Sequence, residues 1–126
     1  KEKIVFSSDK AHVFHLLDKT QWIRVITNLV QNALQSVPKT RNPQIGIQLN
    51  NEPGKTILSI MDNGNGIPDQ IKDKIFEPKF TTKTSGMGLG LGIVKSIIES
   101  HGGDIQYVSK KNKGTTFTIT LPQIDN

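Results

Sequence analysis

One long segment with helical periodicity constrains the fold more than any other feature of this sequence. Asp18 is a typical N-cap residue with Gln21 three positions later, and Pro38 stops the pattern, so we expect a helix over residues 18–37. Apolar side chains cover most of its circumference: Trp22, Val25, Ile26, Leu29, Val30, Ala33 and Val37. A helix this apolar is expected to pack on another layer of structure.

Most of the remaining chain consists of short segments typical of strands. β-branched, aromatic or alternating apolar residues mark six of them: residues 4–7, 13–17, 45–49, 57–61, 105–108 and 116–121. We expect a short helix over 70–76, a loop over 77–87 and a second long helix over 89–100, ended by Gly102 and Gly103. Antiparallel strand pairs with helices on one face predict an α+β fold, a two-layer sandwich with a mixed, mostly antiparallel sheet.

Composition excludes several classes of protein. The 126 residues fit one domain, and the absence of cysteine excludes disulfides, thiol catalysis and cysteine-ligated zinc. No apolar run approaches the roughly 18 residues that a membrane span needs. The chain starts at Lys1 without a signal-peptide pattern, so we expect a cytoplasmic fragment of a longer, possibly membrane-anchored protein. A net charge of +5 favours an anionic ligand such as a nucleotide, although a solvated basic surface is the more common explanation of such a charge.

Amides dominate the polar stripe of the first expected helix. The stripe consists of Gln21, Arg24, Asn28, Gln31, Asn32 and Gln35. An ordinary solvated face prefers lysine and glutamate, whereas asparagine is a poor helix former. Asn28 and Asn32 lie four residues apart and point the same way, and an amide oxygen can ligate Mg²⁺ without adding charge beside a triphosphate. The alternative is a polar helix face with no ligand.

A glycine-rich turn follows the strand expected at 57–61. Asp62 ends that strand, and Gly64 and Gly66 allow the backbone to turn sharply and approach a ligand. A carboxylate at such a turn can accept a hydrogen bond from an adenine amino group, a contact that guanine cannot make in the same way. The alternative is a plain Asx turn after a strand.

The segment 75–83 combines two phenylalanines, two hydroxyls and two lysines without any periodicity. This composition suits a loop that closes over a ligand, with aromatic anchors at its base and cations near phosphates. Phe76 is the candidate anchor, and Thr82 and Lys83 are the candidate ligand contacts. A surface loop with one buried aromatic side chain is the alternative.

Alternating glycines come directly before the second long helix. They are Gly86, Gly88, Gly90 and Gly92, with Leu89 and Leu91 between them. Backbone N–H groups at a helix N-terminus bind phosphate. The pattern is neither a P-loop nor the dinucleotide fingerprint, and the motifs of the eukaryotic-type protein kinases are missing.

Five stretches in this order resemble the GHKL superfamily, which includes gyrase, heat-shock chaperone ATPases, mismatch-repair ATPases and histidine kinases. "NLVQNALQSVP" resembles the N box, "DNGNGIP" the G1 box, "IFEPKFTTK" the F box, "GMGLGLGIVKSIIESHGGDI" the G2 box with its helix, and "GTTFTITLP" the final strand. The resemblance covers nearly the whole chain, and it implies the two-layer fold of that superfamily with ATP and Mg²⁺ as cofactors.

The resemblance implies a role for each matching position. Asn32 is expected to ligate Mg²⁺, and Asn28 to lie beside the phosphates or the metal. Asp62 is expected to bind the adenine amino group, with Gly66 allowing the base to lie close. Thr115 is expected to contact the adenine through water. The loop hinge and the phosphate-binding helix start are assigned to Gly86, Gly88 and Gly90. Further expected nucleotide contacts are Gly64, Ile67, Phe76, Thr82, Lys83, Leu89 and Leu91.

The residue at position 28 separates the branches of the superfamily. ATPase branches, and the similar anti-sigma-factor serine kinases, carry a glutamate four residues before the Mg²⁺ asparagine, where it acts as a base. Here Asn28 cannot take a proton, and a histidine nucleophile needs no base. We therefore expect a protein-histidine kinase, with Asn28 and Lys83 as catalytic residues. "FTTKTSGMGLGLG" resembles the nitrogen-regulation type of sensor kinase, although Lys79 and Gln35 depart from common family residues.

The phosphoacceptor motif of such kinases is missing from this sequence. His12, His15 and His101 are expected to be structural, so the acceptor histidine is expected on a dimerisation hairpin of the same parent protein, with a response regulator acting next. We expect a monomer that contacts neither nucleic acid nor membrane. Two alternatives stay open, an anti-sigma-type serine kinase or ATPase switch, and a nucleotide-binding regulatory module without catalysis.

Overall fold

The computed structural model describes residues 3–8, 19–77 and 90–122. Its elements in chain order are β1 (Lys3–Ser8), α1 (Lys19–Ser36), β2 (Gln44–Glu52), β3 (Lys55–Met61), the 3₁₀ helix η1 (Asp69–Ile71), α2 (Leu91–Ser100), β4 (Asp104–Lys110) and β5 (Gly114–Pro122). The five strands form one sheet in the order β1-β2-β3-β5-β4. β1 pairs in parallel with β2, whereas the other three pairs are antiparallel.

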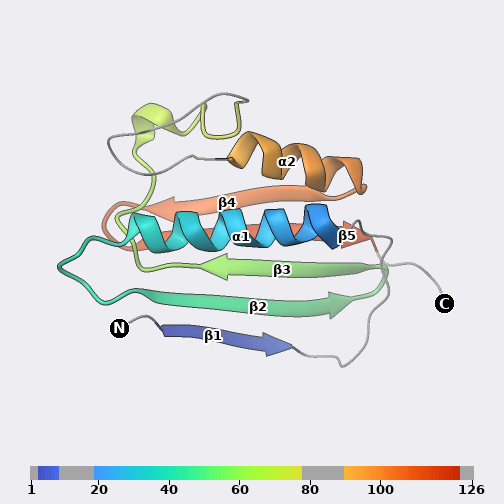
Figure 1. Cartoon of the computed structure of the whole chain (residues 1–126), viewed down its shortest axis with the longest axis horizontal. Coiled ribbons are helices and arrows are strands. Elements are labelled where there is room, and N and C mark those ends of the chain that lie inside the picture. Colours follow the sequence, from blue (N-terminus) through green and yellow to red (C-terminus); the bar gives the residue numbers. More distant parts are fainter. Residues whose placement is uncertain (1–2, 9–18, 78–89, 123–126) are drawn as a thin grey trace.

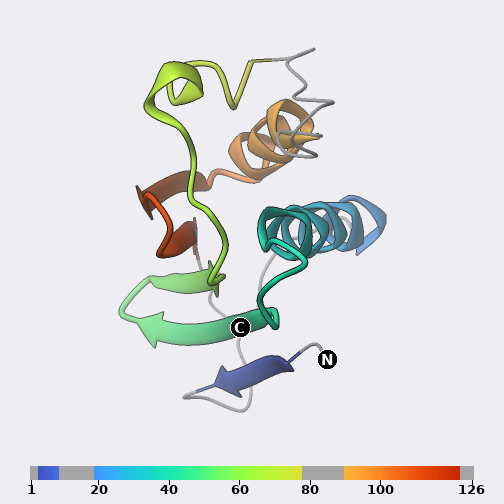
Figure 2. The same cartoon turned by 90° about the vertical axis from the view of Figure 1, so that its left-hand side faces the viewer.

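Both α-helices cover the same face of the sheet (Figures 1 and 2). The sequence-based expectation of an α+β two-layer sandwich with a mixed, mostly antiparallel sheet is therefore confirmed. Between β3 and β5 the chain leaves the sheet, forms η1 and α2, and returns through β4, so that β5 pairs with both β3 and β4. This crossover places the turn after β3 beside the start of β5.

Strand alternation builds the core between the two layers. β5 buries Thr115, Phe117, Ile119 and Leu121 and leaves the residues between them partly exposed. The buried apolar members of the two helices are Val25, Leu29 and Ala33 of α1 and Leu91, Val94, Ile97 and Ile98 of α2. Because side chains alternate with a period of two, a slip of one residue in β5 would move this whole apolar set to solvent.

The end of α2 follows from its sequence. The N–H of Gly103 donates to the carbonyl of Ile98 at 2.9 Å, and the N–H of Gly102 donates to that of Glu99 at 3.0 Å. These two bonds form a Schellman motif, with Gly102 at the position that needs a positive φ, here 79°. The predicted stop at this glycine pair is confirmed.

The helix predicted over 70–76 is wrong in type and length. The structure has the three-residue η1, followed by turns through residue 76. The bonds here join residues three apart, as from the N–H of Lys74 to the carbonyl of Ile71 at 2.9 Å. Ile75 is buried and Phe76 packs on two aromatic rings. These tertiary contacts, and not a helical pattern in the sequence, determine the backbone conformation here.

Other differences concern element boundaries. β2 continues to Glu52, beyond the strand expected over 45–49, so only Pro53 and Gly54 form the turn to β3. The described part of α2 begins at Leu91 with Gly90 as its N-cap. The strand predicted over 13–17, the N-cap at Asp18 and most of the loop predicted over 77–87 lie outside the described residues. Neither helix that the structure describes combines the length and the apolar character that a bilayer crossing needs.

Candidate functional site

Asp62 lies directly after β3, where its carboxylate is held by the turn that it begins. Oδ1 accepts hydrogen bonds from the N–H of Gly64 at 2.8 Å and from the N–H of Thr115 at 3.2 Å. The N–H of Asp62 in turn donates to the carbonyl of Thr115 at 2.9 Å. Both backbone amide donors meet at Oδ1, so neither of them occupies Oδ2.

Burial raises the pKa of the Asp62 carboxyl above its ordinary value, and hydrogen bonds from Gly64, Ser36 and Thr115 offset part of that rise. Ser36 reaches this position from the last turn of α1, where it is itself buried. Its carbonyl also accepts a hydrogen bond from the N–H of Asn65 at 3.0 Å. The end of α1 and the turn after β3 therefore share one polar, partly desolvated environment.

The turn after β3 fits against its neighbours only with a glycine at position 66. Gly66 has φ +82°, and a Cβ placed there would lie 2.6 Å from the carbonyl oxygen of Lys110. The N–H of Asn112 donates to the carbonyl of Asn65 at 2.8 Å, so the β4–β5 hairpin closes over this turn. In this structure the group that lies close to the Gly66 backbone is the protein's own β4–β5 hairpin, at Lys110.

Ser109, which the sequence interpretation missed, pairs with Thr115, a predicted adenine contact, and supports the same turn. Ser109 of β4 lies opposite Thr115 of β5, with their hydroxyl oxygens 2.9 Å apart. The N–H of Ile67 donates to Ser109 Oγ at 2.7 Å. Because 42 residues separate Ser109 from Ile67, no local pattern in the sequence could have indicated this contact.

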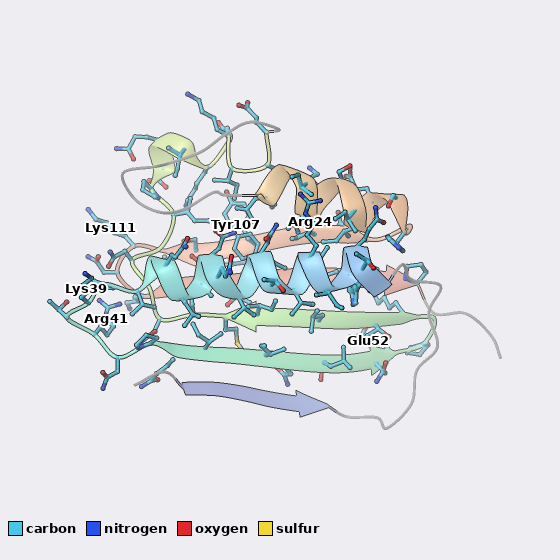
Figure 3. The ribbon with its side chains drawn as sticks, viewed as in Figure 1. Arg24, Lys39, Arg41, Glu52, Tyr107 and Lys111 are labelled. Carbon is cyan, nitrogen blue, oxygen red and sulfur yellow. The ribbon has the colours of Figure 1, made fainter. Side chains whose placement is uncertain are left out.

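Arg41 is a second residue that the sequence interpretation missed. Its Nη1 donates to the carbonyl of Asn63 and, at 3.3 Å, to that of Gly64. The Asn63 side chain bonds back to the same loop, donating to the carbonyl of Asn42 at 3.0 Å and accepting from the N–H of Gln44 at 2.8 Å. The loop after α1 is therefore fastened to the turn that carries Asp62, at the end of the molecule where Figure 3 labels Arg41 and Lys39.

Replacement of Arg41 by alanine is expected to lower the free energy of unfolding by about 1–2 kcal/mol, because two carbonyl groups lose a charged donor. Thermal unfolding should register this as a melting temperature about 3–8 °C lower. Lys39→Ala, at an exposed position two residues earlier, is the matched control and should melt as the wild type does. Equal melting temperatures for both variants would show that the Arg41 contacts contribute nothing.

The amide stripe of α1 divides into two groups. Four of its members are exposed, namely Gln21, Arg24, Gln31 and Gln35, whereas Asn28 is half-buried and Asn32 is 3% exposed. A Cβ placed on Gly90 would lie 2.5 Å from Nδ2 of Asn28. Gly90 is the N-cap of α2, so the Asn28 amide lies against the start of that helix. The structure thus brings the segment that resembles the N box into contact with the segment that resembles the G2 box.

Of the predicted nucleotide contacts, two are part of the hydrophobic core and a third, Phe76, packs against it. Ile67 is 4% exposed and Leu91 is fully buried. The ring of Phe76 lies 6.0 Å from that of Tyr107 and 6.3 Å from that of Phe117, and Lys95 Nζ lies 5.2 Å from its centroid. Phe76 therefore anchors the chain at the base of the expected loop, and Tyr107, labelled in Figure 3, forms part of that anchor.

The remaining predicted positions cannot be placed. Thr82, Lys83, Gly86, Gly88 and Leu89 lie outside the described residues, as do His12, His15 and Lys79.

His101 lies at the end of α2. Its Nδ1 forms a hydrogen bond with the carbonyl of Ile97 at 2.8 Å, and its ring centroid lies 6.3 Å from that of Trp22. Within the described ranges, no group of three histidine, cysteine, aspartate or glutamate residues could hold a metal ion.

Comparison with known proteins identifies the family. Residues 17–125 match the family of histidine kinase-, DNA gyrase B-, and HSP90-like ATPases. The sensor histidine kinase ZraS of Escherichia coli (strain K12) is 40% identical over 105 residues, which are 83% of this chain and 22% of ZraS. The chain therefore spans about a fifth of the length of that relative.

Solved structures give the same result. The nucleotide-free catalytic domain of histidine kinase ThkA superposes with a TM-score of 0.83 at 36% identity, covering 97% of this chain and 79% of that domain. ThkA in complex with the response regulator protein TrrA gives a TM-score of 0.78 at 32% identity, covering 98% of this chain and 34% of that one. With its five boxes, its fold and its relatives in agreement, this chain belongs to the family of histidine kinase-, DNA gyrase B-, and HSP90-like ATPases and is similar to the catalytic domains of sensor histidine kinases.

Proposed function

We propose that this domain binds ATP with Mg²⁺ and donates the γ-phosphate to a histidine on a separate dimerisation hairpin of the same parent protein. The observation that carries the proposal is the fixed Asp62 carboxylate, whose Oδ1 accepts hydrogen bonds from two backbone amides while neither amide occupies Oδ2. An oxygen held in this way accepts a hydrogen bond from the 6-amino group of adenine.

The phosphates would lie toward α2. A helix N-terminus concentrates unpaired N–H groups and a partial positive charge, and α2 begins beside the Asn28 amide. We assign Asn28 to the phosphates or the metal. Thr82, Lys83, Gly86 and Gly88 are proposed to complete this part of the site.

The donor set of α1 fits a magnesium ion that arrives with the nucleotide. Amide oxygens are hard, uncharged ligands, and Mg²⁺ usually keeps several waters and phosphate oxygens among its six ligands. We assign Asn32 as the protein ligand, on the same helix and four residues after Asn28. The ion would neutralise charge that develops on the β- and γ-phosphates.

The amide at position 28 supports histidine as the acceptor. Attack by water or by a serine hydroxyl needs a base that removes a proton, and the Asn28 side chain cannot do this. Neutral imidazole attacks through a free lone pair and needs no base. An ATPase switch or a serine kinase would require a carboxylate elsewhere in the site, and a regulatory module without catalysis would require only the adenine contacts.

The proposed partners follow from this reaction. The phosphorylated histidine would pass its phosphoryl group to a response regulator, and the ThkA–TrrA complex supports a partner of that kind. Because ATP is the donor substrate, we place the domain in the cytoplasm. We also propose that residues 1–126 form one catalytic unit of a longer sensor kinase.

Calorimetric titration with ATP, with and without Mg²⁺ and with GTP as the control, tests the binding half of this proposal. We expect saturable binding of ATP, tighter with Mg²⁺, and none of GTP. Equal affinities for ATP and GTP would contradict the adenine contact assigned to Asp62.

A further inference from the structure

Arg41 contacts the turn that carries Asp62 from the loop after α1. Its Nη1 donates to the carbonyl oxygen of Asn63 and, at 3.3 Å, to that of Gly64. The direction of both bonds is fixed, because a guanidinium group only donates and a carbonyl oxygen only accepts. Arg41 is half-buried, whereas Lys39, two residues earlier in the same loop, is exposed.

One peptide group joins this cation to the Asp62 carboxylate. The carbonyl of Asn63 and the N–H of Gly64 belong to the same planar peptide unit. Arg41 donates to its carbonyl oxygen, and its N–H donates to Asp62 Oδ1 at 2.8 Å. Consecutive hydrogen bonds polarise one another, so a cation on the carbonyl strengthens the N–H as a donor. Arg41 therefore acts on Asp62 through the peptide between residues 63 and 64.

A glycine at position 64 leaves this peptide with little local restraint. Glycine tolerates backbone angles that other residues avoid, so the peptide before it can rotate and withdraw its N–H from Asp62. The bond from Arg41 to the Asn63 carbonyl opposes that rotation. The Asn63 side chain fastens the same turn to the loop through Asn42 and Gln44. Loss of Arg41 should therefore release the peptide without detaching the turn.

The Gly64 N–H also bears on the protonation of Asp62. Burial raises the pKa of the Asp62 carboxyl, and the hydrogen bond from Gly64 lowers it more than those from Ser36 and Thr115 do. No charged side chain of the described residues is among the causes of this shift. Because a weaker bond to the charged form raises the pKa of a carboxyl, release of the Gly64 N–H should raise it further. The charged side chains on the loop and the hairpin that flank this turn are those of Lys39, Arg41, Lys110, Lys111 and Lys113.

We propose that Arg41 is a positioning residue for base recognition, which fixes the Asn63–Gly64 peptide so that the Gly64 N–H holds the Asp62 carboxylate in one orientation. A carboxylate that keeps its charge and its orientation presents the acceptor that the 6-amino group of adenine needs. Arg41 acts through the peptide and does not touch the base. Its effect on nucleotide affinity rests on the proposed binding of ATP, whereas its effect on Asp62 is measured without nucleotide.

The first measurement is made on the ligand-free domain. Aspartate labelled at its carboxyl carbon is titrated with pH by NMR in the wild type, Arg41→Ala, Arg41→Lys and the matched control Lys39→Ala, and Asp62→Asn identifies the Asp62 signal. We expect the Asp62 titration to move to higher pH in Arg41→Ala, because the carboxylate loses part of its hydrogen bonding. Arg41→Lys keeps a cationic donor and should stay near the wild type. Lys39→Ala should not move the titration.

Calorimetric titration with ATP at several pH values measures the effect on binding, with unfolding curves to check that each variant is folded. We expect Arg41→Ala to weaken ATP about fivefold at neutral pH, the size of one hydrogen bond. The loss should grow as the pH falls, because Asp62 of the variant is protonated first. Protonation of ATP itself is common to all variants and cancels in the ratio of their affinities. Arg41→Lys should recover most of the affinity, and Lys39→Ala should bind as the wild type does.

Two results would overturn the inference. An Asp62 titration that is the same in Arg41→Ala and in the wild type would show that Arg41 does not act on the carboxylate, whatever happens to ATP affinity. A shifted titration with unchanged ATP affinity would show that Arg41 does not contribute to base recognition. If the wild type bound no ATP while the titration shifted as expected, the proposed function would fail and the effect of Arg41 on Asp62 would stand.

Discussion

Asp62→Asn is expected to weaken ATP binding by a factor of about 100 or more, because the amide must turn its donor toward the base. Two backbone N–H groups, of Gly64 and Thr115, donate to Oδ1 of the native carboxylate. The asparagine keeps its oxygen at this position to satisfy both donors, which places its NH₂ group where Oδ2 was. A donor then faces the donor on the 6-amino group of adenine. A lost charged hydrogen bond and an unpaired buried donor together account for about 3 kcal/mol.

The same variant should change the order of nucleotide affinities. The new NH₂ group can donate to O6 of hypoxanthine, so ITP should lose less affinity than ATP, or gain some. Calorimetry on the wild type and the variant with both nucleotides measures this, and unfolding curves check that the variant is folded. Equal loss of ATP and ITP would show that Asp62 supports the pocket without contacting the base.

Gly114→Ala is expected to have the largest effect on stability. Gly114 has φ +127°, and a Cβ placed there would lie 1.9 Å from the carbonyl oxygen of Asp62 and 3.2 Å from Cα of Asn63. Both are backbone atoms, so no side-chain rotation relieves the overlap. We expect the free energy of unfolding to fall by about 3–5 kcal/mol. The melting temperature should fall by more than about 10 °C.

Gly54→Ala separates backbone strain from overlap. Gly54 has a positive φ of +79° in the exposed β2–β3 turn, and its Cβ would meet nothing within 4 Å. Because alanine in the left-handed conformation is strained, this variant should lower the free energy of unfolding by only about 1–2 kcal/mol. Thermal and denaturant unfolding of the two variants gives the comparison. A similar loss of stability in Gly114→Ala and Gly54→Ala would mean that the start of β5 can move away from the turn at Asp62 with little loss of free energy.

The sequence predicted the fold where local chemistry decides it. The α1 segment ends before Pro38, the alternation of β5 appears unchanged in its burial, and the glycine pair after α2 forms the expected helix stop. The prediction of a helix over 70–76 was wrong, because the packing of Ile75 and Phe76 overrides any helical periodicity there. The resemblance of the loop to nitrogen-regulation kinases stays a prediction, because residues 78–89 lie outside the described part of the chain.

The sequence indicated candidate ligand residues at this site and missed the residues that support it. Asp62, Asn28 and Gly90 are candidates because a carboxylate, an amide and glycines in these motifs suit a nucleotide, and their contacts with a ligand stay predictions. The structure brings Asn28 and Gly90 into contact. Arg41 and Ser109 act on backbone groups 22 and 42 residues away in the chain. Contacts of that kind depend on which loops the sheet order brings together, and no residue pattern encodes them.

Phosphoryl transfer tests the central claim most directly. The domain is mixed with ATP labelled at the γ-phosphate, Mg²⁺ and the separately produced dimerisation hairpin of its parent protein, beside a hairpin whose acceptor histidine is replaced by alanine. The account predicts acid-labile, alkali-stable label on the wild-type hairpin only, none with Asp62→Asn, and little inorganic phosphate when the hairpin is omitted. Rapid release of inorganic phosphate by the domain alone, with no label on the histidine, would contradict it and would assign the chain to the ATPase branch of its family.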